Sequence, residues 1–130
     1  MRGVAWWSGC VRRRHTEREV WRRGIALVKA IYGATLAFPG HERYGLTSQL
    51  RRASVSVPAN IAEGAARGSR KESRQFLTVA RGSLSEVETL LVMAREVGYL
   101  EKNEEQTLME TCNQVSALLN GLIASLDRRR

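Results

Sequence analysis

The chain has 130 residues, enough for one core of moderate-length helices and too few for two independent cores, which excludes a multidomain protein. Charged residues make up 26% and hydrophobic residues 43%, a balance that excludes global disorder. The formal net charge is +8, but residues 25–127 sum to zero, which excludes a uniformly basic surface.

Residues 1–20 are expected to form a tail outside the folded domain, either disordered or added by an upstream start codon. Its apolar stretch, residues 3–11, is short and runs into arginines without a small-residue cleavage site, so it does not indicate a signal peptide. Cys10 and Cys112 are far apart in sequence, and no disulfide is expected. The few cysteines and the lack of a membrane-length apolar span predict a cytoplasmic protein with no membrane segment.

The first helix is predicted to begin near Trp21, where apolar residues recur at alternating spacings of four and three until Pro39 and Gly40 end the pattern. Its predicted buried positions are Trp21, Ile25, Val28, Tyr32, Thr35 and Phe38.

The second helix is predicted to begin near Thr47, taken as its N-cap. Pro58 lies inside it, removes one backbone donor and crowds the preceding turn, so we expect a kink near residues 54–57 rather than two helices. The predicted buried positions are Leu50, Ala53, Val57, Ile61 and Gly64.

The third helix has the clearest pattern, with Ser69 and Glu72 as a capping box and Gly98 as the closing cap. Asn103 and Gln106 are predicted to start the fourth helix. The predicted buried positions are Leu77, Ala80, Leu84, Val87, Leu91, Ala94 and Gly98 in the third helix, and Leu108, Cys112, Val115, Leu119, Leu122 and Leu126 in the fourth.

Short loops force neighbouring helices to run antiparallel, and stripes spaced at about 3.5 residues favour shallow crossing angles. The sequence therefore predicts an all-α protein, an antiparallel up-down-up-down four-helix bundle over residues 21–127, followed by a basic tail at residues 128–130.

Two features predict that the bundle assembles into a homo-oligomeric ring. Gly82 lies inside the third helix, where glycine costs about 1 kcal/mol relative to alanine, so close approach of another helix, from the same or a neighbouring subunit, is expected. A ligand contact is the alternative. Residues 43–81 carry a net +6 and residues 82–127 a net −6, which suits a polyanion partner or head-to-tail self-association. The alternative explanation of this charge distribution is a solvated surface of mixed charge without a binding role.

Catalytic and metal-binding chemistry are not expected. Both histidines, His15 and His41, lie outside the four predicted helix cores, so inward carboxylates lack the imidazole partners of a di-iron site and hydroxyls lack a base. Residues 64–68 lack the Lys-Ser/Thr that completes a phosphate loop. The sequence predicts no enzyme, no metal and no cofactor.

A basic cluster is the candidate site for RNA or DNA. It lies on the second helix and at the N-terminus of the third, where free backbone amides favour anions. Aromatic residues are not expected to interleave with it, so backbone-directed binding without base stacking is predicted, and intersubunit salt bridges are the alternative. The candidate residues are Arg51, Arg52, Arg67, Arg70, Lys71 and Arg74.

Two segments, YGLTSQLRRASVSVPANIAEG at 44–64 and FLTVARGSLSEVETLLVMAREVGY at 76–99, resemble the 23S rRNA intervening sequence proteins, and the resemblance covers roughly residues 21–126. It implies a bacterial cytoplasmic four-helix bundle without established enzymatic activity. Related bundles form homopentamers, and one relative, the accessory protein of diversity-generating retroelements, binds nucleic acid and a reverse transcriptase. The resemblance thus implies a homopentamer, with RNA, DNA or a reverse transcriptase as partners. An assembly scaffold or protein-interaction module without a nucleic-acid role is the alternative.

Overall fold

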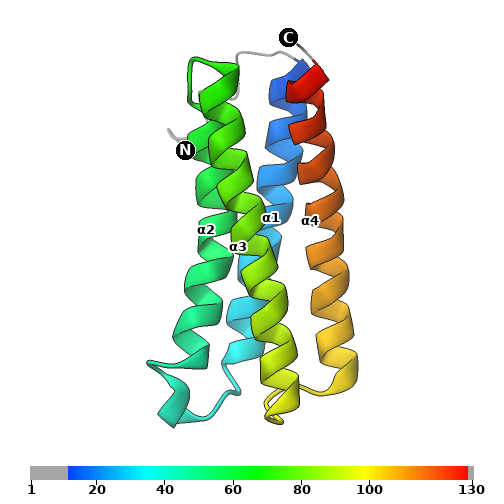
Figure 1. Ribbon diagram of the computed structural model, residues 1–130. Coiled ribbons are helices and arrows are strands. Elements are labelled where there is room, and N and C mark those ends of the chain that lie inside the picture. The colour runs from blue at the N-terminus through cyan, green and yellow to red at the C-terminus, as the bar shows by residue number, and fades with distance from the viewer. Residues whose placement is uncertain (1–11, 129–130) are drawn as a thin grey trace.

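The computed structural model describes residues 12–128 and contains four long helices. These are α1 (Arg12–Thr35), α2 (Leu46–Ala65), α3 (Arg70–Glu96) and α4 (Lys102–Arg128), with a short 3-10 turn, η2 (Gly40–Glu42), between α1 and α2. Helices adjacent in sequence pack against each other and α1 packs against α4, with α2 and α3 in the most extensive contact (Figure 1). The predicted all-α up-down-up-down bundle is confirmed.

None of these four helices is long and apolar enough to cross a membrane, within the described part of the chain. The buried side chains of all four converge on one core along the bundle axis, which accounts for the regular apolar spacing in the sequence.

Helix α1 begins at Arg12, earlier than the predicted start at Trp21. Val20 is fully buried, so the residues just before Trp21 belong to the packed helix. His15, placed outside the helices by the sequence, is an exposed residue of α1. Cys10 lies outside the described residues.

The predicted buried stripe of α1 was wrong in part. Ile25 is 45% exposed and Tyr32 is 42% exposed, whereas Val20, Leu27 and Ile31 form the buried face. Both sets recur at spacings of three, four or seven, and anchoring the stripe on Trp21 rather than Val20 rotated it by about 100°. Toward the end of the stripe the prediction was right, because Thr35 and Phe38 are buried.

The N-terminus of α2 is capped from outside the helix. Thr47, the predicted N-cap, is a buried residue of the first turn, and Gly45 occupies the cap position without a side-chain bond. Instead the Glu42 carboxylate accepts hydrogen bonds from the Leu46 N–H (2.8 Å) and from the Tyr99 hydroxyl (2.7 Å). The bond from Leu46 and then that from Tyr99 lower the pKa of the Glu42 carboxyl.

Helix α2 continues through Pro58 as one helix, as predicted. Pro58 is buried against α1, and a Cβ built at Gly24 would lie 3.2 Å from the Pro58 Cβ, so the glycine leaves room for the ring. The kink near residues 54–57 stays a prediction. The predicted buried positions of α2 are all confirmed: Leu50, Ala53, Val57, Ile61 and Gly64.

The predicted cap residues lie at both ends of α3, but the capping box is confirmed only in part, because no bond from the Ser69 N–H to the Glu72 side chain occurs among the described residues. The Ser69 hydroxyl accepts a hydrogen bond from the Glu72 N–H (3.1 Å). At the other end Gly98 has φ 88°, its N–H bonds to the Arg95 carbonyl (3.0 Å), and the Tyr99 N–H bonds to the Ala94 carbonyl (2.8 Å). This is the double bond pattern that glycine in the left-handed region permits at a helix end.

Helix α4 begins one residue before Asn103, and the Glu104 side chain accepts a hydrogen bond from the Glu101 N–H (2.8 Å), so the predicted start with Asn103 and Gln106 was slightly late. The buried stripes predicted for α3 and α4 are confirmed, except that Gly98 closes α3 as an exposed residue. Confirmed positions are Leu77, Ala80, Leu84, Val87, Leu91 and Ala94, and Leu108, Cys112, Val115, Leu119, Leu122 and Leu126.

Candidate nucleic-acid interface

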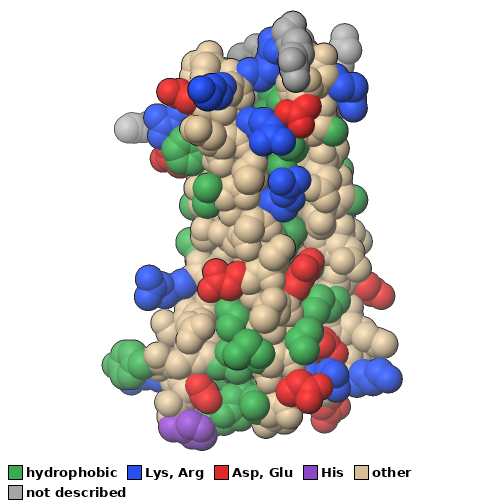
Figure 2. All heavy atoms as spheres, viewed as in Figure 1, with side chains coloured by type: hydrophobic (Ala, Val, Ile, Leu, Met, Phe, Trp, Pro, Cys, Tyr) green, Lys and Arg blue, Asp and Glu red, His purple; other side chains and the backbone are tan. Residues whose placement is uncertain are grey.

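Exposed cations gather at the end of the bundle where α2 and α4 finish and α3 begins. Figure 2 shows Lys and Arg side chains concentrated toward this end, and most acidic side chains on that face in the opposite half. We call this surface the basic end and define it by Arg67, Arg70, Lys71, Arg74 and Arg128.

The structure does not bring all six predicted residues together. Arg52 lies about 20 Å from the C-terminal end of α2, given 1.5 Å of rise per residue. Arg51 and Arg52 therefore lie apart from the basic end, which holds the other four: Arg67, Arg70, Lys71 and Arg74.

Arg51 ties α2 to α1. Its Nε donates to the Thr35 hydroxyl (2.8 Å), and its guanidinium carbon lies 4.5 Å from the centre of the Tyr32 ring. Arg52 points to the other side of α2, where it lines a polar cavity of about 280 Å³ between α2 and α3 together with Ser56, Ser83 and other residues. These two neighbours in sequence thus serve different surfaces.

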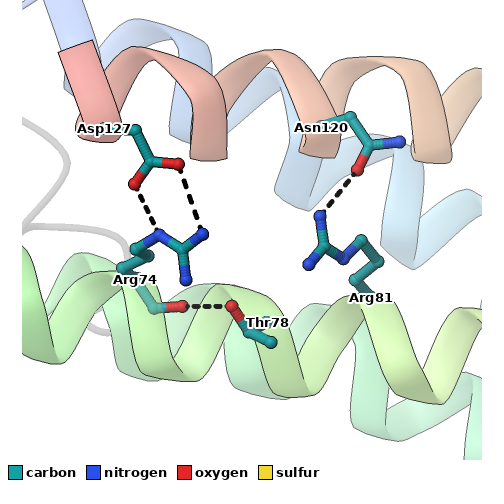
Figure 3. Close-up of polar contacts among 5 residues, drawn as sticks. All are labelled: Arg74, Thr78, Arg81, Asn120 and Asp127. Carbon is teal, nitrogen blue, oxygen red and sulfur yellow. Dashed lines mark hydrogen bonds and ion pairs between the residues drawn. The ribbon is translucent and has the colours of Figure 1, made fainter.

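Arg74 is committed to α4 by two hydrogen bonds to Asp127, Nε to Oδ1 (2.5 Å) and a terminal nitrogen to Oδ2 (3.2 Å), as Figure 3 shows. The hydrogen bond and the charge of Asp127 raise the pKa of Arg74. Farther along α3, Arg81 donates to the Asn120 side chain (3.2 Å). The positive charge of Arg74 is therefore largely offset within the bundle.

Arg67 is also paired, but in a different way. A terminal nitrogen bonds to the Glu63 carboxylate (2.6 Å), and the guanidinium carbon lies 4.5 Å from the centre of the Phe76 ring. The prediction that no aromatic residue interleaves with the cluster was wrong here. Phe76 lies in the next helix, and the turn between α2 and α3 brings it beside Arg67.

Arg70 and Lys71 are free cations of the basic end. They are the first two residues of α3 and are exposed, and their side chains have no ion pair or hydrogen bond within the described part of the chain. The first-turn amides of α3 lie beside them and add a partial positive charge, although the Glu72 N–H is taken by Ser69. Arg128, assigned to the tail by the sequence, is the last residue of α4 and is likewise exposed at this end.

The outer face of α3 carries Gly82, whose predicted close approach to another helix of the same subunit was wrong. Gly82 is exposed, and a Cβ built there would meet nothing within 4 Å among the described residues. The same face exposes the apolar side chains of Val79, Met93 and Val97. A neighbouring copy and a ligand remain as explanations for the glycine.

No group of three potential metal ligands occurs among residues 15–128. Cys112 is a buried free thiol of α4.

Comparison with known proteins gives the family. A solved structure described as a protein of unknown function from the S23 ribosomal protein family of Bacteroides thetaiotaomicron VPI-5482 has the same fold, with a TM-score of 0.77 at 18% identity, over 84% of this chain and 98% of that one. No curated protein matches the chain. The model of the 23S rRNA-intervening sequence proteins matches residues 16–121, most of the bundle. The chain therefore belongs to the 23S rRNA-intervening sequence protein family.

Proposed function

We propose that this protein is a noncatalytic, self-associating bundle in the cytoplasm whose basic end binds the phosphate backbone of RNA or DNA. The observation that carries the proposal is the pair of unpaired cations, Arg70 and Lys71, at the start of α3. Exposed cations beside helix N-terminal amides suit phosphate groups, and they recognise charge rather than sequence.

Two partners follow from the family resemblance rather than from a contact in the bundle. One is a set of further copies of the chain, a pentamer by analogy with related bundles. The other is a reverse transcriptase. For self-association the chain itself offers the exposed face of α3, where Gly82 and the apolar side chains of Val79, Met93 and Val97 are uncovered.

The binding proposal predicts that reversing the charge of Arg70 and Lys71, as Arg70→Glu with Lys71→Glu, weakens binding to all RNA and DNA sequences alike. For a duplex, log affinity should fall with log salt at about −0.9 per neutralised phosphate, so the double variant should have a slope shallower by about 2 units. Titrations of a labelled duplex at several salt concentrations measure both quantities.

The matched control is Lys29→Glu with Lys102→Glu, which changes the net charge equally on exposed positions away from the basic end. A much smaller loss is expected from this pair. If the two double variants lose affinity equally, overall charge rather than the basic end drives binding. If the unaltered chain shows no salt-sensitive binding, the scaffold alternative is the better description.

The assembly proposal predicts that Gly82→Leu weakens self-association more than it changes helix content. A Cβ at this position meets nothing within 4 Å in the part of the subunit that the structure describes, so a leucine should disturb only a surface that a second copy covers. Light scattering at micromolar concentration and circular dichroism measure the two effects. Gly121→Leu is the control, since Gly121 is also an exposed helical glycine and no described residue lies within 4 Å of its Cβ position. A monomeric unaltered chain would contradict the proposal.

A further inference from the structure

Arg67 differs from the free cations of the basic end. Its charge is offset by Glu63, so it adds little to the attraction of phosphates. What it offers instead is a flat guanidinium group whose position is fixed by two contacts.

The two contacts leave part of that group accessible. The guanidinium carbon lies over the Phe76 ring, 4.5 Å from the ring centre, and one terminal nitrogen bonds to the Glu63 carboxylate at 2.6 Å. The Arg67 side chain is still 40% exposed, and no second ring covers its guanidinium among the described residues. A guanidinium plane stacks favourably on nucleobases, and a plane already held in position loses less side-chain entropy on binding.

The surroundings favour a base at this position. Arg70 and Lys71 lie three and four residues after Arg67 in the sequence. Both are free to hold the phosphates on either side of a base. Arg51 makes a similar contact with the Tyr32 ring, but it faces α1. Its neighbour Arg52 faces the polar cavity between α2 and α3. No comparable arrangement of free cations accompanies Arg51 within the described residues.

We propose that Arg67 and Phe76 form a stacking platform for one unpaired base, so that the basic end binds single-stranded RNA or DNA in preference to a duplex. The inference rests on the proposed function. Bases in a duplex are already stacked on each other and cannot reach the platform, whereas bases in a single strand can.

The test compares three fluorescent ligands by anisotropy at one salt concentration. They are oligouridylate, the same sugar-phosphate strand with abasic sites, and a mixed-sequence duplex. The unaltered chain is expected to bind oligouridylate about fivefold more tightly than the abasic strand, the lower end of what stacking of one base contributes. Arg67→Lys keeps the charge and the reach to Glu63 but has no plane, so it should remove this difference.

Two matched substitutions keep the result interpretable. Arg70→Lys makes the same change at a residue without an aromatic neighbour, and it should leave the ratio of the two affinities unchanged. Phe76→Leu keeps an apolar side chain and should reduce the ratio as Arg67→Lys does; if circular dichroism shows that it does not fold, Arg67→Lys alone decides.

Three outcomes would overturn the platform. One is equal binding of oligouridylate and the abasic strand, and another is a ratio that Arg67→Lys does not change. The third is loss of the ratio in Arg51→Lys instead, which would place the stacking site on Tyr32. In each of these cases salt-dependent binding of the duplex would leave the proposed function standing. Failure of all three ligands to bind would overturn both.

Discussion

Leu91→Ala is expected to lower the free energy of unfolding by about 2–5 kcal/mol, a large share of the stability of a small domain. Leu91 is 0% exposed and lies within the single core cluster to which all four helices contribute. Alanine would remove its buried methyl groups and leave a cavity that packed neighbours fill only in part. Urea denaturation followed by circular dichroism measures the change.

Val92→Ala is the natural control, because Val92 is the next residue of α3 and is exposed. It should change the free energy of unfolding by no more than about 0.5 kcal/mol. An unchanged midpoint for Leu91→Ala would contradict the assignment of the α3 stripe to the core.

Gly64→Ala is expected to destabilise the bundle by about 1–3 kcal/mol, although alanine is the better helix former. At Gly64 the backbones of α2 and α3 approach each other, and a Cβ would lie 3.0 Å from the Ser73 carbonyl oxygen and 3.3 Å from the Phe76 Cβ. The Ser73 hydroxyl also donates to the Gly64 carbonyl (2.6 Å). Making room for a methyl group therefore requires the two helices to separate and this bond to lengthen.

The same substitution at Gly121 should have the opposite sign. Gly121 lies on the exposed side of α4, and none of residues 12–128 comes within 4 Å of its Cβ position, so alanine should stabilise the helix by up to about 1 kcal/mol. Thermal unfolding of the two variants beside the unaltered chain measures the contrast. Stabilisation by Gly64→Ala would show that α2 and α3 do not pack closely there.

The buried face of a helix could be predicted from the sequence where the helix has one apolar stripe. The prediction failed where a helix has two such stripes. In α3 the residues from Leu77 to Ala94 leave one choice of buried face. In α1, Val20, Leu27 and Ile31 compete with Ile25 and Tyr32, and periodicity alone cannot rank two stripes that differ by one position. Packing against the other helices decides between them.

The candidate site could be predicted where it is local in sequence. Five consecutive positions of the chain include Arg67, Arg70 and Lys71, so chain connectivity alone keeps these residues close together. The separation of Arg52 also follows from the sequence, because the length of α2 is set by its residue count. The partner of Arg74 does not, since Asp127 lies 53 residues away and only helix packing brings it near.

The reactivity of Cys112 can be used to measure how often α4 separates from the core of the bundle. Burial raises the pKa of this thiol to about 12, with a smaller contribution from the charge of Glu88. Near pH 8 the reactive thiolate is therefore rare at this position in the folded state. An alkylating reagent should therefore modify Cys112 chiefly in molecules whose α4 has separated from the core. With Cys10 replaced by serine, the rate of labelling reports how often α4 separates from the core.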